Sequence, residues 1–157
     1  MTRDLAAQAG QILLERHLKL AVAESCTGGL LANLITDIAG SSDYFLGGIV
    51  AYAYSAKEAL LGVRHETLLA HGAVSPQTAA EMAWGVRRVF RADIGISITG
   101  IAGPTGGLPG KPVGLVYMHL AADDAEIGEQ GLWDGDRVGN KQRSATAALQ
   151  LLLRYLG

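Results

Sequence analysis

The sequence AESCTGG, residues Ala23–Gly29, follows a short apolar run and opens a helical repeat of leucine and isoleucine. This pattern predicts a strand that turns directly into a helix, with Ser25 in the turn. The first N–H groups of a helix lack partners within it and carry the positive end of its dipole, so they favour an anion. Glycines let a ligand approach such a backbone closely. Thr27, Gly28 and Gly29 are therefore candidate substrate-binding residues.

Ser25 has two interpretations at this stage. A serine beside free backbone N–H groups suits acyl transfer, because one turn supplies both the nucleophile and the donors for an oxyanion. Alternatively, Ser25 or Thr27 only caps the helix, as serine and threonine commonly do. The neighbouring thiol of Cys26 is a rival nucleophile, since cysteine is intrinsically more nucleophilic. The turn alone leaves these alternatives open.

Composition limits the class of protein. The chain has 157 residues, a net charge of -2 and 49% hydrophobic residues with 6% aromatic, which predicts a single α/β domain over residues 1–157. A pI near 6.0 gives nucleic-acid binding little electrostatic support. The only cysteine, Cys26, cannot form an internal disulfide. We see neither a signal peptide nor an apolar stretch that would span a membrane, so we expect a cytoplasmic protein.

Apolar spacing predicts an alternation of helices and strands. We expect helices near residues 3–16, 30–38, 55–61, 66–70, 76–90 and 140–156, and strands near 19–23, 45–54, 94–99, 113–121 and 130–133. The short connection between the last two strands predicts an antiparallel pair. The pair Gly47-Gly48 indicates a bulge or a close approach. Ser75-Pro76 predicts a helix start with Ser75 as N-cap.

Lys57 lies in a second helix start. Ser55–Glu58 matches the capping box, which predicts a helix beginning at Ser55 with Lys57 in its first turn. A cation there opposes the helix dipole, which favours the neutral, basic amine. The alternative is a solvated surface lysine.

A glycine-rich loop over residues 100–112 follows the strand that ends at Thr99. Loops at the carboxyl end of a strand are where open α/β sheets bind ligands. The hydroxyl of Thr99 and the backbone at Gly100 and Gly103 are thus candidate donors to a phosphate or carbonyl group. The spacing does not match a P-loop. The alternative is a long hairpin connection.

Arg137 and Lys141 cluster near the start of the last helix. Because cations there oppose the helix dipole, an anionic ligand explains them better than helix stability does. The structural alternative is pairing with Asp134 or Asp136. The four histidines show no metal-ligand spacing with one another or with Cys26, so we expect no metal site.

The motifs, taken together, resemble the C-terminal domain of the competence/damage-inducible protein CinA. They are AESCTGG at residue 23, TDIAGSSDYF at 36, GGIVAY at 47, HGAVS at 71, ITGIAGPTGG at 98, KPVGLVY at 111 and GDR at 135. The resemblance spans nearly the whole chain. It implies a three-layer α/β/α sandwich with a mixed, mainly parallel sheet, and a homodimer. The chain resembles the stand-alone form, because the N-terminal domain of full-length CinA is not seen.

Such stand-alone proteins are nicotinamide-nucleotide amidases (NMN deamidases) of pyridine nucleotide salvage. The resemblance therefore implies hydrolysis of the carboxamide of nicotinamide mononucleotide to nicotinate mononucleotide and ammonia, with no metal or cofactor and no nucleic-acid or membrane partner. It implies Ser25, Tyr52 and Lys57 as the catalytic group. Tyr54 is a second candidate hydroxyl, and Lys141 stands where the family usually has arginine. The alternative is a non-catalytic nucleotide-binding or regulatory module linked to competence or DNA damage.

Overall fold

The computed structural model describes all 157 residues of the chain. One five-stranded sheet, in the order β2-β1-β3-β4-β5, forms its centre. In chain order the elements are α1 (Thr2–Glu15), β1 (Leu20–Glu24), α2 (Leu30–Thr36), the short 3-10 helix η1 (Ser41–Asp43), β2 (Phe45–Val50), α3 (Tyr54–Leu61), α4 (His65–His71), α5 (Pro76–Phe90), β3 (Ile94–Gly100), β4 (Leu115–Ala121), β5 (Glu126–Leu132) and α6 (Arg137–Leu156).

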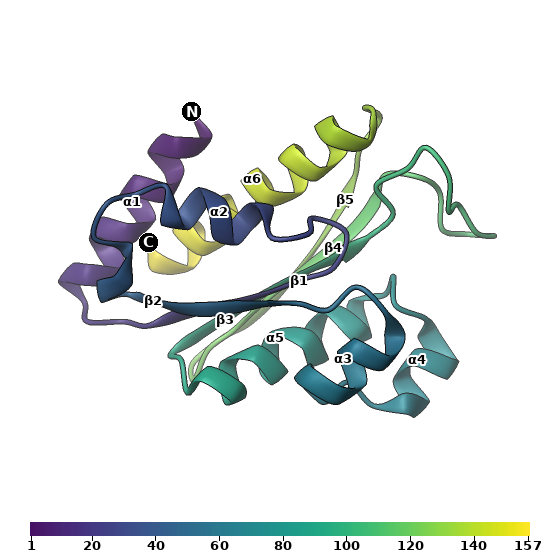
Figure 1. Cartoon of the computed structure of the whole chain (residues 1–157), viewed down its shortest axis with the longest axis horizontal. Helices are drawn as coiled ribbons and strands as arrows, with labels where there is room; N and C mark the ends of the chain where they lie inside the picture. The colour runs from purple at the N-terminus through teal and green to yellow at the C-terminus, as the bar shows by residue number, and fades with distance from the viewer.

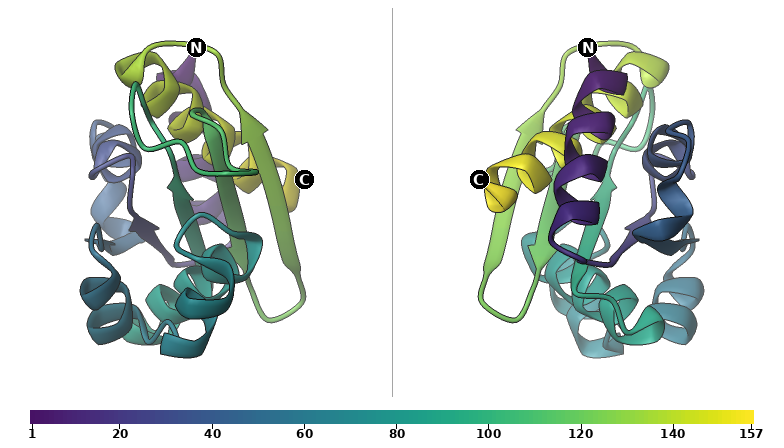
Figure 2. Two further views of the ribbon diagram at one scale, coloured as in Figure 1. Left: turned by 90° about the vertical axis from the view of Figure 1, so that its right-hand side faces the viewer. Right: turned by 90° about the vertical axis from the view of Figure 1, so that its left-hand side faces the viewer.

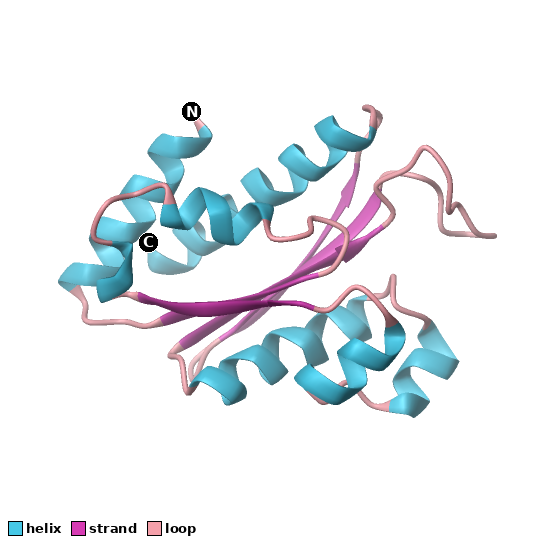
Figure 3. Ribbon diagram, viewed as in Figure 1, coloured by secondary structure: helices cyan, strands magenta, loops and turns pink.

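Helices cover both faces of the sheet. Helices α1, α2 and α6 lie on one face, and α3, α4 and α5 lie on the other (Figure 1). The same three layers are visible when the elements are coloured by type (Figure 3). Strand β1 is buried along its whole length, as expected for a central strand covered on both sides. The predicted α/β class with a mixed sheet is confirmed.

Strand direction brings several strand ends together. Strand β1 pairs in parallel with both β2 and β3, whereas β4 is antiparallel to β3 and β5 is antiparallel to β4. The antiparallel pairing of β4 and β5, two long neighbouring strands at one side of the sheet (Figure 2), agrees with the sequence-based prediction. Because two reversals restore direction, β1, β2, β3 and β5 all end at the same edge of the sheet. Ligands bind at such an edge in open α/β sheets.

Two local predictions are confirmed by specific contacts. The Ser75 side chain accepts a hydrogen bond from the Thr78 N–H at 3.1 Å, with Pro76 in the first helical position. The glycine pair marks both a bulge and a close approach. The β1–β2 register shifts between Leu20 and Ala21, and a Cβ on Gly47 would lie 2.5 Å from the Phe90 ring. A side chain at that glycine would collide with α5.

The helix that carries Lys57 begins differently from the prediction. Strand β2 ends at Val50, and α3 begins at Tyr54 after Ala53, with no side-chain capping bond. The Lys57 N–H donates to the Ala53 carbonyl at 3.1 Å, which closes the first turn two residues earlier than a Ser55 cap would. The predicted capping box is therefore wrong.

The last helix also begins earlier than its apolar pattern indicates. The Asp136 side chain accepts from the Gly139 N–H at 2.7 Å and caps α6 at Arg137. The polar residues of the first turn gave no apolar signal. In this fold, no helix combines the length and apolar character needed to cross a membrane.

Candidate active site

An open cleft of about 230 Å³ lies at the edge where the strands end. It is lined by residues that follow β1, β2 and α4, by the end of β3 and the loop after it, by one residue of α3 and by the first residue of α6. Among the residues predicted from sequence, those lining it are Ser25, Tyr52, Lys57, Thr99, Gly100, Gly103 and Arg137. The fold thus gathers residues up to 112 positions apart in one place.

Ser25 and Lys57 meet at the base of this cleft. The Ser25 N–H donates to the Ile98 carbonyl of β3 at 3.0 Å, which fixes the residue at the end of β1. The Lys57 amine, on α3, lies 2.9 Å from the Ser25 hydroxyl oxygen and donates to the carbonyls of Ala51 at 2.8 Å and Tyr52 at 3.0 Å. A neutral amine has two N–H donors and one lone pair. The carbonyls of Ala51 and Tyr52 match the two N–H donors, and the Ser25 hydroxyl matches the lone pair.

The surroundings of Lys57 favour loss of its proton. The residue is 1% exposed, and no carboxylate pairs with its amine. Burial disfavours the charged form and lowers the pKa of the Lys57 amine from 10.5 to about 8. The sequence prediction relied on the helix dipole, but the physical cause in the structure is desolvation. A basic amine in contact with a hydroxyl can take its proton.

The two tyrosines beyond β2 have separate partners. The Tyr52 hydroxyl accepts from Arg137 at 3.0 Å, and the same guanidinium donates to the Gly103 carbonyl at 2.7 Å. The Tyr54 hydroxyl instead accepts from the Ala73 N–H at 3.2 Å. Lys57 therefore contacts the carbonyl of Tyr52 and the Ser25 hydroxyl directly, with no tyrosine hydroxyl between them.

The turn after Ser25 differs from the expected row of free helix N–H groups. The carboxylate of Glu24, itself 1% exposed, accepts from the N–H groups of Gly29 at 3.2 Å, Leu31 at 3.0 Å and Ala32 at 3.0 Å. The Gly28 N–H donates to the Ser25 carbonyl at 3.1 Å. The positive end of α2 is therefore occupied by a side chain of the protein.

Of three other predicted residues, two lie outside the cleft lining, and the third uses its hydroxyl in a bond within the protein. Thr27 is buried, and its hydroxyl has no hydrogen-bond partner. The Thr99 hydroxyl donates to the Ala73 carbonyl at 2.8 Å. The Lys141 amine lies near Gly28 rather than in the cleft.

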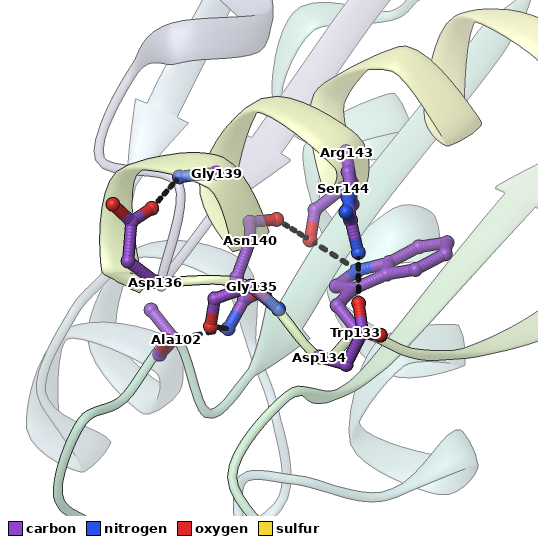
Figure 4. A network of polar contacts seen from close by, with 9 residues as sticks. All are labelled: Ala102, Trp133, Asp134, Gly135, Asp136, Gly139, Asn140, Arg143 and Ser144. Carbon is purple, nitrogen blue, oxygen red and sulfur yellow. Dashed lines mark hydrogen bonds and ion pairs between the residues drawn. The ribbon is translucent and has the colours of Figure 1, made fainter.

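A buried asparagine that sequence reasoning missed joins the start of α6 to the glycine-rich loop (Figure 4). The Asn140 amide nitrogen donates to the carbonyls of Ala102 and Gly135, each at 3.0 Å, and its oxygen accepts from the Gly135 N–H at 3.0 Å. Ser144 links the Asn140 carbonyl to the Trp133 indole. These bonds hold the segment that presents Arg137. An asparagine inside a helix, where it is a poor helix former, was the available signal.

Cys26 also lines the cleft, next to Ser25. Burial raises the pKa of its thiol to about 11, and the Glu24 carboxylate adds to the rise. Since the thiolate is the nucleophilic form, Cys26 is a poor nucleophile near neutral pH.

Comparison with known proteins agrees with this fold. The family model described as the CinA C-terminal domain matches residues 2–156. A protein of Moorella thermoacetica is 55% identical over 152 residues, which cover 97% of this chain and 37% of the relative. The chain thus spans little more than a third of the length of this relative and of a second one from Halothermothrix orenii.

Solved structures superpose along almost the whole chain. The competence/damage inducible protein CihA from Agrobacterium tumefaciens is 39% identical, with a TM-score of 0.95 over 98% of this chain and 94% of that one. A competence or damage-inducible protein from Enterobacter asburiae is 34% identical, with a TM-score of 0.97 over 100% and 99%. With a family match from end to end and the same fold at this identity, the chain belongs to the CinA C-terminal domain family.

Proposed function

We propose that this chain is an amidohydrolase that converts nicotinamide mononucleotide and water to nicotinate mononucleotide and ammonia. The observation that carries the proposal is the contact between the Lys57 amine and the Ser25 hydroxyl, 2.9 Å apart in a cleft. A buried lysine with a lowered pKa beside a serine is a nucleophile–base pair. A module that only binds nucleotides has no use for such a pair. The choice of substrate rests on the family resemblance.

The geometry supports a direct role for each group. The neutral Lys57 amine takes the proton as the Ser25 oxygen attacks the carboxamide carbon. The resulting ammonium returns that proton to the departing nitrogen, so ammonia leaves and an ester to Ser25 remains. Water then attacks the ester carbonyl, with the same amine as base; the bond to the Ser25 oxygen breaks, the Lys57 ammonium returns its proton to that oxygen, and the carboxylate product leaves. We assign the phosphate of the substrate to Arg137, which lines the cleft and whose guanidinium can donate to phosphate oxygens.

The deciding experiment measures ammonia release from nicotinamide mononucleotide by the wild-type chain and three variants. We expect Ser25→Ala and Lys57→Met to lose at least about a thousandfold in kcat, as removal of a nucleophile or its base commonly does. Lys19→Met, an exposed lysine outside the cleft, should match wild type. Saturable binding of the nucleotide with no turnover by wild type would reject the amidase and support the regulatory module.

The family resemblance also leads us to propose that the chain works as a homodimer without metal or cofactor. Sedimentation at micromolar concentration tests the first point, and turnover in the presence of a chelator tests the second. A monomer with full activity would contradict the dimer.

A further inference from the structure

Glu24 is the one buried carboxylate of the chain, and it lies next to the candidate nucleophile. Strand β1 is otherwise apolar, so a charge at its last position costs solvation unless it is fully hydrogen-bonded. Three N–H groups from the first turn of α2 meet this need. The Glu24 carbonyl also accepts from the Ala51 N–H at 2.8 Å, and the Ala51 carbonyl in turn accepts from Lys57. Glu24 thus directly precedes Ser25 in the chain and is linked to Lys57 through the backbone of Ala51.

The bonds of this turn leave few donors for a ligand. The N–H groups of Gly28 and Gly29 are engaged within the turn, and that of Ser25 is engaged by β3. The N–H groups of Cys26 and Thr27 donate to no backbone carbonyl. Only Cys26 of these two lines the cleft. The backbone N–H that follows a nucleophilic serine is a usual donor of an oxyanion hole.

We propose that Glu24 is a positioning residue of the reaction: its carboxylate holds the turn so that the N–H of Cys26 points at the oxygen of the tetrahedral intermediate. This inference rests on the proposed function and adds to it the identity of the oxyanion donor. The carboxylate does not contact the substrate. It acts through its hydrogen bonds to the N–H groups of Gly29, Leu31 and Ala32, which fix the turn between β1 and α2.

Glu24→Gln is the discriminating variant, because it keeps the shape of the side chain but replaces one acceptor oxygen by a donor. That donor would face an N–H group of Leu31 or Ala32, so the turn must shift. We expect kcat to fall about 10²-fold, the effect of losing one oxyanion donor, while KM changes less than about threefold. Glu24→Asp, which restores the carboxylate, should recover part of kcat. Glu66→Gln, an exposed first-turn acid of α4, is the matched control.

Counting active sites distinguishes the positioning role of Glu24 from a merely structural one. A fluorophosphonate reacts with an activated serine: a bond from the Ser25 oxygen to phosphorus forms, fluoride leaves, and Lys57 receives the proton. The rate of this labelling and the turnover per labelled site should both fall in Glu24→Gln. A variant that only loses folded protein would keep the wild-type turnover per labelled site, and this result would overturn the inference.

Because the chain has a single cysteine, NMR can observe the proposed oxyanion donor, the N–H of Cys26, directly. Protein labelled with ¹⁵N-cysteine shows one amide resonance, that of Cys26. When Ser25 carries the phosphonyl group, its oxygen mimics the oxyanion, and the Cys26 amide proton should move downfield in wild type and less in Glu24→Gln. An unmoved resonance in labelled wild type would overturn the assignment. If wild type is not labelled at all, Ser25 is not the nucleophile, and the proposed function and this inference both fail.

Full labelling without release of ammonia from the mononucleotide separates the two proposals. That outcome would reject the proposed substrate, whereas the labelling rates and the Cys26 resonance would still decide the role of Glu24.

Discussion

The Lys57 amine and the Ser25 hydroxyl oxygen are 2.9 Å apart, although 32 positions separate the two residues in the sequence. Ser25 directly follows strand β1, and Lys57 belongs to α3, which lies on the same face of the sheet as α4 and α5. Two backbone carbonyls complete the surroundings of the amine. The amine is therefore held in place by groups that carry no charge, which leaves burial as the main influence on its proton.

This arrangement predicts a pH dependence of turnover. Burial lowers the pKa of Lys57 to about 8, and the proposed base is the neutral amine. We expect kcat/KM to rise about tenfold per pH unit below pH 8 and to level off above it. Lys57→Arg, which stays protonated, should be inactive throughout. A profile that is flat from pH 6 to 9 would exclude Lys57 as the base.

The same shift predicts a pH dependence of stability. The folded-state pKa of Lys57 is depressed, so between about pH 8 and 10.5 the unfolded chain binds more protons than the folded one. The contribution of Lys57 to the free energy of unfolding must then rise with pH in that window, by roughly 3 kcal/mol in total. Denaturant unfolding of wild type and Lys57→Met measures it as a difference, in which the other titrating groups cancel. A difference that is constant from pH 8 to 10.5 would contradict the pKa.

Cys26 provides a test of the rival nucleophile. Burial raises the pKa of its thiol to about 11, so less than about one thiol in a thousand is ionised at pH 7.5. We expect Cys26→Ala to keep activity within about threefold of wild type, because its backbone N–H is retained and only the side chain is lost. Loss of turnover in Cys26→Ala together with retention in Ser25→Ala would exchange the roles of the two residues.

The sequence predicted the parts of this site that depend on local patterns. The Ser75 cap, the glycine approach at Gly47 and the antiparallel last strands follow from short-range rules. It did not predict the roles of Glu24 and Asn140. Both side chains are satisfied by backbone groups whose positions depend on the packed fold, and no short spacing encodes such partners. For the same reason the helix start near Lys57 was misplaced.

The position of α3 depends on its close contact with α5. A Cβ on Gly85 of α5 would lie 1.9 Å from the Leu61 carbonyl oxygen at the end of α3. Alanine favours a helix over glycine by about 1 kcal/mol, but such a clash forces the helices apart at a cost of about 3 kcal/mol or more. We expect Gly85→Ala to lower both Tm and kcat, since α3 carries Lys57. Gly107→Ala, whose Cβ would have its nearest neighbour at 3.6 Å, is the control for thermal unfolding.

Arg137 is expected to select substrates that carry a phosphate. Its guanidinium bridges the Gly103 carbonyl and the Tyr52 hydroxyl at the mouth of the cleft, and no carboxylate neutralises it. Arg137→Ala should raise KM for nicotinamide mononucleotide about 10- to 100-fold, the weight of a charge-assisted contact of roughly 1.5–3 kcal/mol. We expect wild type to turn over nicotinamide riboside, which lacks the phosphate, more weakly, and the same variant should leave that turnover unchanged. Arg143→Ala is the matched control on the same helix, because Arg143 is exposed and pairs with Asp134.

The comparison of the two substrates separates two roles of this arginine. If Arg137→Ala impairs the nucleotide and the riboside equally, the guanidinium works by holding Gly103 and Tyr52 in place, and the phosphate binds elsewhere. Tyr52→Phe then helps to locate the effect, since it removes one of these bonds and keeps the charge. A selective loss with the nucleotide in Arg137→Ala, little change in Tyr52→Phe, and partial recovery in Arg137→Lys would together require a charge contact at the phosphate.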